Sequence, residues 1–115
     1  MAQLSTLGHF ERMTQFHQGM KFRSLRDVPV HGIVSYGAPF STGFDAVLPA
    51  GEILICGQKP GPKGMWLVPA RYEHFEELFV PERDRQHPDY SSYALSCSFG
   101  QIGQDYELFD SQAVA

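Results

Sequence analysis

The chain has 115 residues, a formal net charge of -4 at pH 7 and 43% hydrophobic residues. This size suits one domain with one core, and the composition excludes a disordered chain, because disordered segments combine few hydrophobic residues with high net charge. A pI near 5.6 without an arginine-rich stripe argues against nucleic acid as a partner, since phosphate backbones are bound through clustered lysine and arginine.

No apolar run approaches the roughly 18 residues that span a bilayer. The start, MAQLSTLGHFERM, lacks a basic patch followed by an apolar stretch, and the tail, SQAVA, lacks a prenylation cysteine. We therefore expect a cytoplasmic protein with no membrane partner.

Apolar residues near the start of the chain recur close to helical spacing, which predicts an N-terminal helix. The alternative is a partly ordered arm, because a glycine inside the pattern costs about 1 kcal/mol relative to alanine in a helix. The predicted organisation is this helix or arm at 1–18, a single β domain at 19–110 and a tail at 111–115. The apolar residues of the pattern are Leu7, Phe10, Met13 and Phe16.

From Gly19 onward, clusters of Gly, Pro and Asp recur at the turn spacing of small all-β barrels and sandwiches. The strongest strand is 92–99, where large residues such as Tyr93, Leu95 and Cys97 alternate with small ones and so face a core. The predicted strands are 20–25, 33–36, 44–48, 52–56, 65–68, 92–99 and, more weakly, 106–109.

Two segments rich in Gly and Pro separate some of these predicted strands. Pro49 to Gly51 has the residues of a tight reversal, which predicts a hairpin over 44–56. The segment 57–64, GQKPGPKG, is predicted to be a surface loop, because its prolines and glycines interrupt any ladder and its spacing does not match a phosphate-binding loop.

Residues 71–79 switch to helical spacing, and Pro81 ends the pattern. A helix this short needs a packing partner, so we expect its apolar face to cover an open end or edge of the sheet. The charged segment 81–90 then forms a solvated link. Apolar residues on one face are Tyr72, Phe75, Leu78 and Phe79, and acidic residues on the other are Glu73, Glu76 and Glu77.

The segment GMWLVPARYEHF, residues 64–75, resembles the tryptophan strand, proline and short helical turn of SH3 domains. The predicted order of elements, a helix, about five short strands and one helical turn before the last long strand, is also that expected of a small SH3-like barrel. The acidic, tyrosine-bearing loop with which SH3 domains grip proline-rich peptides has no match near residues 20–30, so peptide binding is not implied. The predicted fold is a mainly β domain, either a small SH3-like barrel or a strongly curved antiparallel sheet, with an N-terminal helix and one short helix before the last long strand. An isolated sandwich sheet is the alternative.

The sequence contains no local catalytic, cofactor-binding or metal-binding signature, and we expect no cofactor. Cys56 and Cys97 form no CxxC pair and are predicted to be separate buried thiols, because Cys97 shares the core face of its strand. The five histidines fall into no metal-ligand pattern. They are His9, His17, His31, His74 and His87.

Two surfaces are candidates for protein interaction. The loop-like segment YGAPFSTGF carries three aromatic residues, Tyr36, Phe40 and Phe44, although Phe40 and Phe44 alternatively fold back into the core. The second candidate is the acidic face of the 71–79 helix. Residues 71–115 carry a net charge of -6, which favours a basic protein as the partner.

These observations predict a noncatalytic protein-interaction module, of the kind that small acidic inhibitors or immunity proteins represent. An alternative is an enzyme whose site is assembled from dispersed residues, with His31, His74 or His87 beside a carboxylate. A third hypothesis is a structural homo-oligomer in which an exposed barrel edge pairs with its copy.

Overall fold

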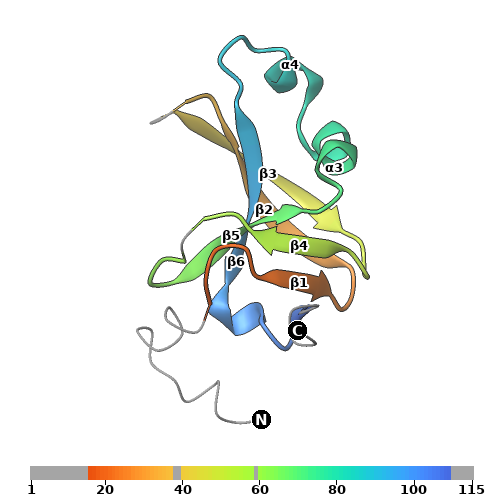
Figure 1. Cartoon of the computed structure of the whole chain (residues 1–115). Coiled ribbons are helices and arrows are strands. Elements are labelled where there is room, and N and C mark those ends of the chain that lie inside the picture. Colours follow the sequence, from red (N-terminus) through yellow and green to blue (C-terminus); the bar gives the residue numbers. More distant parts are fainter. Residues whose placement is uncertain (1–15, 38–39, 59, 110–115) are drawn as a thin grey trace.

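Seven strands form one antiparallel sheet in the computed structural model, which describes residues 16–37, 40–58 and 60–109 (Figure 1). The prediction of a mainly β domain is confirmed. The strands are β1 (Lys21–Ser24), β2 (Val28–Ser35), β3 (Ser41–Leu48), β4 (Ile53–Cys56), β5 (Gly64–Pro69), β6 (Ser92–Ser98) and β7 (Tyr106–Leu108). The helices are α3 (Tyr72–Phe79), α4 (Glu82–Arg85) and the 3-10 turn η1 (Phe99–Gln101).

The sheet formed by the described residues is open. Its strand order is β3-β2-β6-β5-β4-β1-β7, so β3 and β7 are the two edges and do not pair with each other. The structure therefore does not confirm a closed barrel. The predicted N-terminal helix lies mostly outside the described residues, and the described residues 16–18 are not helical.

The hairpin predicted over 44–56 is wrong. β3 pairs with β2 and β4 pairs with β1, so residues 49–52 carry the chain around a corner between two strands that are not partners. Ser24 holds this corner. Its hydroxyl donates to the Pro49 carbonyl at 2.7 Å and accepts from the Glu52 amide at 2.9 Å, while its own carbonyl accepts from the Gly51 amide at 2.8 Å.

Strand β6 connects the two halves of the sheet. Its first residues pair with β2 and its last residues pair with β5, so that Leu95 lies opposite both Gly32 and Leu67. The cartoon shows β6 as one long strand that runs between the end of the molecule bearing α3 and α4 and the end bearing β1 and β7 (Figure 1). The alternation predicted for this strand is confirmed, because Tyr93, Leu95 and Cys97 are all buried.

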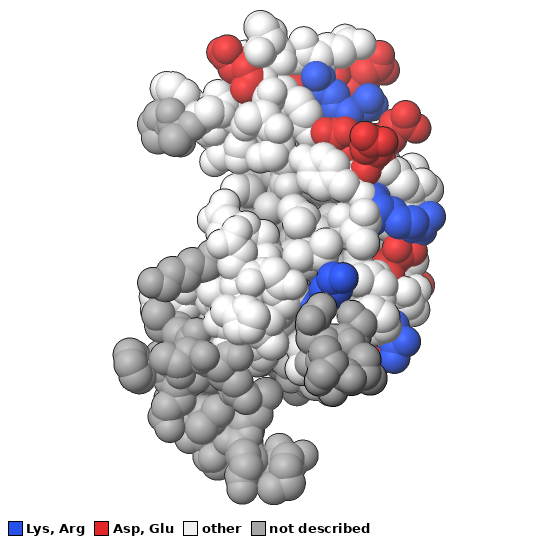
Figure 2. Space-filling view, in the orientation of Figure 1, with Lys and Arg blue, Asp and Glu red and all other residues white. Residues whose placement is uncertain are grey.

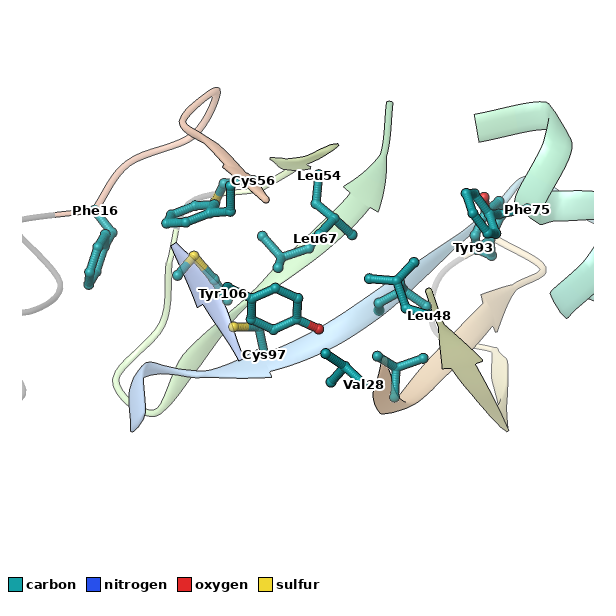
Figure 3. Packing of buried hydrophobic residues seen from close by; sticks show 14 of the residues in the cluster. Phe16, Val28, Leu48, Leu54, Cys56, Leu67, Phe75, Tyr93, Cys97 and Tyr106 are labelled. Carbon is teal, nitrogen blue, oxygen red and sulfur yellow. The ribbon is translucent and has the colours of Figure 1, made fainter. Parts of the chain in front are cut away.

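The core follows the concave face of the curved sheet. Figure 3 shows a row of buried side chains from Phe16 at one end, past Cys97 and Tyr106, to Tyr93 on β6 and Phe75 on α3. Each strand contributes at least one buried residue to this row, and β2, β5 and β6 contribute alternate residues, as the pleat requires. The two cysteines are free and buried, as predicted.

The two helices differ from their predictions in detail. Phe75 is buried and Phe79 packs against the core, but Leu78 is 64% exposed and does not belong to the apolar face. The link predicted at 81–90 contains the helix α4, in which Asp84 and Arg85 are half-buried. Among the described residues, no helix has the length and apolar character needed to traverse a bilayer.

We expect Ser24→Ala to lower the free energy of unfolding by about 2 kcal/mol, because it leaves the Pro49 carbonyl and the Glu52 amide without their partner at a buried position. Ser92→Ala, at an exposed position of β6, is the control and should change stability by no more than about 0.5 kcal/mol. Urea unfolding followed by circular dichroism measures both values. Equal stability of the two variants would contradict the assigned role of Ser24.

Two buried tyrosines offer a matched comparison. The Tyr93 hydroxyl donates to the Tyr72 carbonyl at 2.7 Å, whereas the Tyr106 hydroxyl has no hydrogen-bond partner among the described residues. We expect Tyr93→Phe to cost about 1 kcal/mol and Tyr106→Phe to be neutral or stabilising, because only the first change removes a bond. Urea unfolding of the two variants tests this order, and a larger loss for Tyr106→Phe would refute it.

Candidate interaction surface

Aromatic packing fastens α3 to the sheet. The Phe79 ring lies 6.2 Å from the ring of Phe44 on β3, and the Tyr72 ring lies 4.6 Å from that of Tyr93 on β6. Phe75 is 1% exposed between them. The helix is thus held through its apolar side, which leaves the opposite side to solvent.

Tyr36, one of the predicted interaction residues, joins the β2–β3 tip to α4. Its hydroxyl donates to Asp84 at 2.5 Å, and its ring lies 4.9 Å from the ring of His87. The hydrogen bond to the Asp84 carboxylate raises the pKa of Tyr36, because it stabilises the neutral phenol. Tyr36 is half-buried, and its contacts with Asp84 and His87 hold the β2–β3 tip against α4 and the residues that follow it.

The predicted loop over 36–44 is in part a strand, because β3 begins at Ser41. Phe44 is half-buried and lies over Gly32, where a Cβ atom would come within 2.3 Å of the phenyl ring. The alternative in which this ring folds back into the core therefore holds for Phe44. Phe40 differs, because it is 70% exposed just before β3.

The three predicted glutamates of α3 divide into two groups. Glu73 and Glu77 are exposed, whereas Glu76 is half-buried and accepts a hydrogen bond from the Tyr90 hydroxyl. Burial, and then this bond to Glu76, raises the pKa of Tyr90. Glu76 thus fixes the segment after α4, and the two exposed glutamates are free to meet a partner.

We call residues 72–90 the acidic end. This segment holds six carboxylates and two arginines, a net charge of -4. Figure 2 shows acidic side chains gathered over α3 and α4, with basic ones between them. None of the salt bridges between described residues uses a carboxylate of the acidic end; their acidic members are Asp45, Glu52, Asp105 and Glu107.

Outside the acidic end, one histidine lies beside a carboxylate. His31 Nδ1 is 2.9 Å from Asp45 Oδ1 on the outer face of β2 and β3, where the two side chains are 61% and 88% exposed. His74 is exposed and packs edge-on against Phe75. No cluster of three or more His, Cys, Asp or Glu side chains suited to a metal ion occurs in the described part of the chain.

A hollow of about 560 Å³ lies where Gln58 and residues 61–63 meet β5 and β6. Trp66 and Met65 supply much of its apolar wall, and Lys63 and Cys97 are its described titratable groups. Burial raises the pKa of Cys97 to about 12, so this thiol stays neutral near pH 7. The described lining therefore offers no acid and base pair of the kind that the enzyme alternative requires.

Three residues of this surface were not among the predicted interaction residues: Asp84, Tyr90 and His87, the last of which was predicted only for the enzyme alternative. All three fall in the segment that the sequence marks only as charged and proline-containing, and their contacts reach Tyr36 and Glu76, which lie 48 and 14 residues away from their partners. No local pattern encodes such contacts.

Comparison with protein-family models, curated proteins and solved structures finds no match to this chain. The functional argument therefore rests on the geometry of the described residues.

We expect Cys97 to resist alkylation in the folded protein. Its pKa of about 12 keeps the thiol protonated at pH 8, so iodoacetamide should react at least about a hundredfold more slowly than with the exposed cysteine introduced by Ser92→Cys on the same strand. Because folding raises the pKa of Cys97, the contribution of this thiol to the free energy of unfolding is fully present below the pKa of the unfolded chain. It is lost as the pH rises from there towards about 12. Mass spectrometry of alkylated peptides measures the rates, and equal rates would contradict the burial of Cys97.

Proposed function

We propose that this chain is a noncatalytic protein-interaction module whose acidic end binds a basic surface of another protein. A strongly curved sheet of the SH3-like barrel kind serves as its rigid scaffold. An acidic inhibitor or immunity-type protein is the form of module that this proposal favours. The observation that carries it is the exposure of Glu73 and Glu77 at the acidic end, with no salt bridge to a described residue.

The packing beneath the acidic end supports this function. Phe75, Phe79 and Tyr72 fix α3, and the bonds from Tyr36 to Asp84 and from Tyr90 to Glu76 fix the following segment. Carboxylates on a rigid base lose little conformational entropy on binding, which favours affinity. A complementary basic surface also accelerates association, and this effect weakens with salt.

The test compares wild type with Glu73→Gln/Glu77→Gln, which neutralises the two exposed carboxylates without touching Glu76. The control, Gln104→Lys/Glu107→Gln, changes the net charge by the same amount outside the acidic end. Protein captured from the source cells by tagged wild type is identified, purified and titrated against all three proteins by calorimetry.

We expect the dissociation constant to rise about tenfold for the double glutamine variant and little for the control, since charged contacts at an interface are specific to position. The affinity of wild type should also fall with ionic strength. A captured protein that binds all three chains equally, or the capture of nothing beyond bare beads, would refute the proposal.

A further inference from the structure

Strand β3 presents an open row of backbone hydrogen-bonding groups. The His31 and Ser35 carbonyls of β2 accept from Ser96 and Ser91, so these odd-numbered positions of β2 face β6. In an antiparallel pair, the residues opposite them must direct their amides and carbonyls away from β2. These are Ser41, Gly43, Asp45 and Val47, and their backbone groups lie along an edge that no other described strand pairs with.

Within the described part of the chain, this edge lacks the devices that usually protect a sheet. β3 runs for eight residues in unbroken register with β2, without a bulge, a proline or a lysine. Its charged residue, Asp45, is bonded to His31 of the same chain. The opposite edge, β7, is three residues long. The exposed edge of β3 is thus long and carries one charged side chain.

Exposed apolar side chains accompany the same edge. Among the described residues, the three most exposed large hydrophobic side chains are Phe40 at 70%, Leu78 at 64% and Val47 at 58%. Phe40 directly precedes β3, and Val47 lies on it, on the face opposite to that of Phe44. Leu78 belongs to α3, whose Phe79 ring packs on Phe44 at the core face of β3. Two of these three side chains therefore belong to β3 or directly precede it, as expected for an edge that another chain covers.

We propose that two copies of this chain pair through their β3 edges, antiparallel, about a two-fold axis at Phe44. In this register Gly43 lies opposite Asp45 of the second copy and Ser41 lies opposite Val47, and each opposed pair exchanges two backbone hydrogen bonds. Asp45 meets a residue without a side chain, so no like charges lie directly opposite.

The chemistry of the edge favours a second copy as the occupant. A basic strand would find the Asp45 carboxylate already bonded to His31, whereas a second β3 matches the edge in length, in its low content of charged residues and in apolar side chains. A pair related by a two-fold axis uses both β3 edges and stops at two chains. Head-to-tail assembly would instead have to pair β3 of one copy with β7 of the next, and β7 is only three residues long. The pairing uses no carboxylate of the acidic end and is independent of the proposed function.

The first test is the mass in solution by sedimentation equilibrium over a wide range of concentration. We expect two chains of 12.9 kDa each in a reversible complex. Val47→Pro removes one outward amide without disturbing a bond to β2, and should shift the complex to single chains. Wild type that stays a single chain at every concentration, whether because its edge is covered by another segment or reserved for another protein, overturns the proposal.

The second test probes the register and does not depend on proline. Gly43→Asp places a carboxylate opposite Asp45 of the second copy, and Gly43→Lys places an ammonium there. Both side chains meet the same neighbour, the exposed His31 ring, 3.1 Å from the Cβ position.

Because the two-fold axis repeats each contact, the dissociation constant for self-association should be about tenfold higher for Gly43→Asp than for Gly43→Lys. The pair Gln104→Asp and Gln104→Lys, away from the edge, controls for net charge and should differ little. Circular dichroism confirms that each variant folds. A dissociation constant for self-association that changes neither with Val47→Pro nor with the sign of the charge at position 43 overturns the proposal.

Discussion

The hydrogen bonds of Ser24 hold the bend at residues 49–52, where the chain passes from the β2–β3 pair to the β1–β4 pair. The rest of the fold depends on this bend. Ser24 is 2% exposed and bonds through its hydroxyl, amide and carbonyl to residues 49–52. Both pairs belong to the same sheet, and residues of both pairs contribute to one core. A straight sheet of this length would leave its apolar face to water. The same bend makes β3 an edge, because the chain after Leu48 leaves β2 to pair with β1.

The acidic end separates the groups that stabilise from those that remain exposed. Tyr36, Tyr90 and Glu76 are half-buried. Tyr36 donates to Asp84 of α4 and Tyr90 donates to Glu76 of α3, and these two bonds hold α3 and α4 in place. Glu73 and Glu77 face water and are paired in none of the salt bridges between described residues. Exposed carboxylates add little to stability, which leaves them free to be positioned for a partner.

Local periodicity predicted some elements well and failed where pairing is nonlocal. The strand at 92–99 and the helix at 71–79 appear as Ser92–Ser98 and Tyr72–Phe79, because alternation and helical spacing reflect one buried face. The turn at 49–51 gave no information on which strands pair across it, since that choice is made by Ser24, some 25 residues earlier. Phe44 is similar: its place over Gly32 follows from the β2–β3 register and not from its neighbours in sequence.

The acidic end and the β3 edge are connected by geometry, although neither proposal needs the other. Antiparallel pairing of two edges in one sheet requires a two-fold axis perpendicular to that sheet, so equivalent faces of both copies lie on the same side. Since Phe79 seats α3 on the core side of β3, through Phe44, both acidic ends would face the same way. A partner with two basic patches would then bind both ends at once, and the second contact would be intramolecular. Its affinity would exceed that of either contact alone, by a factor that the spacing of the patches sets.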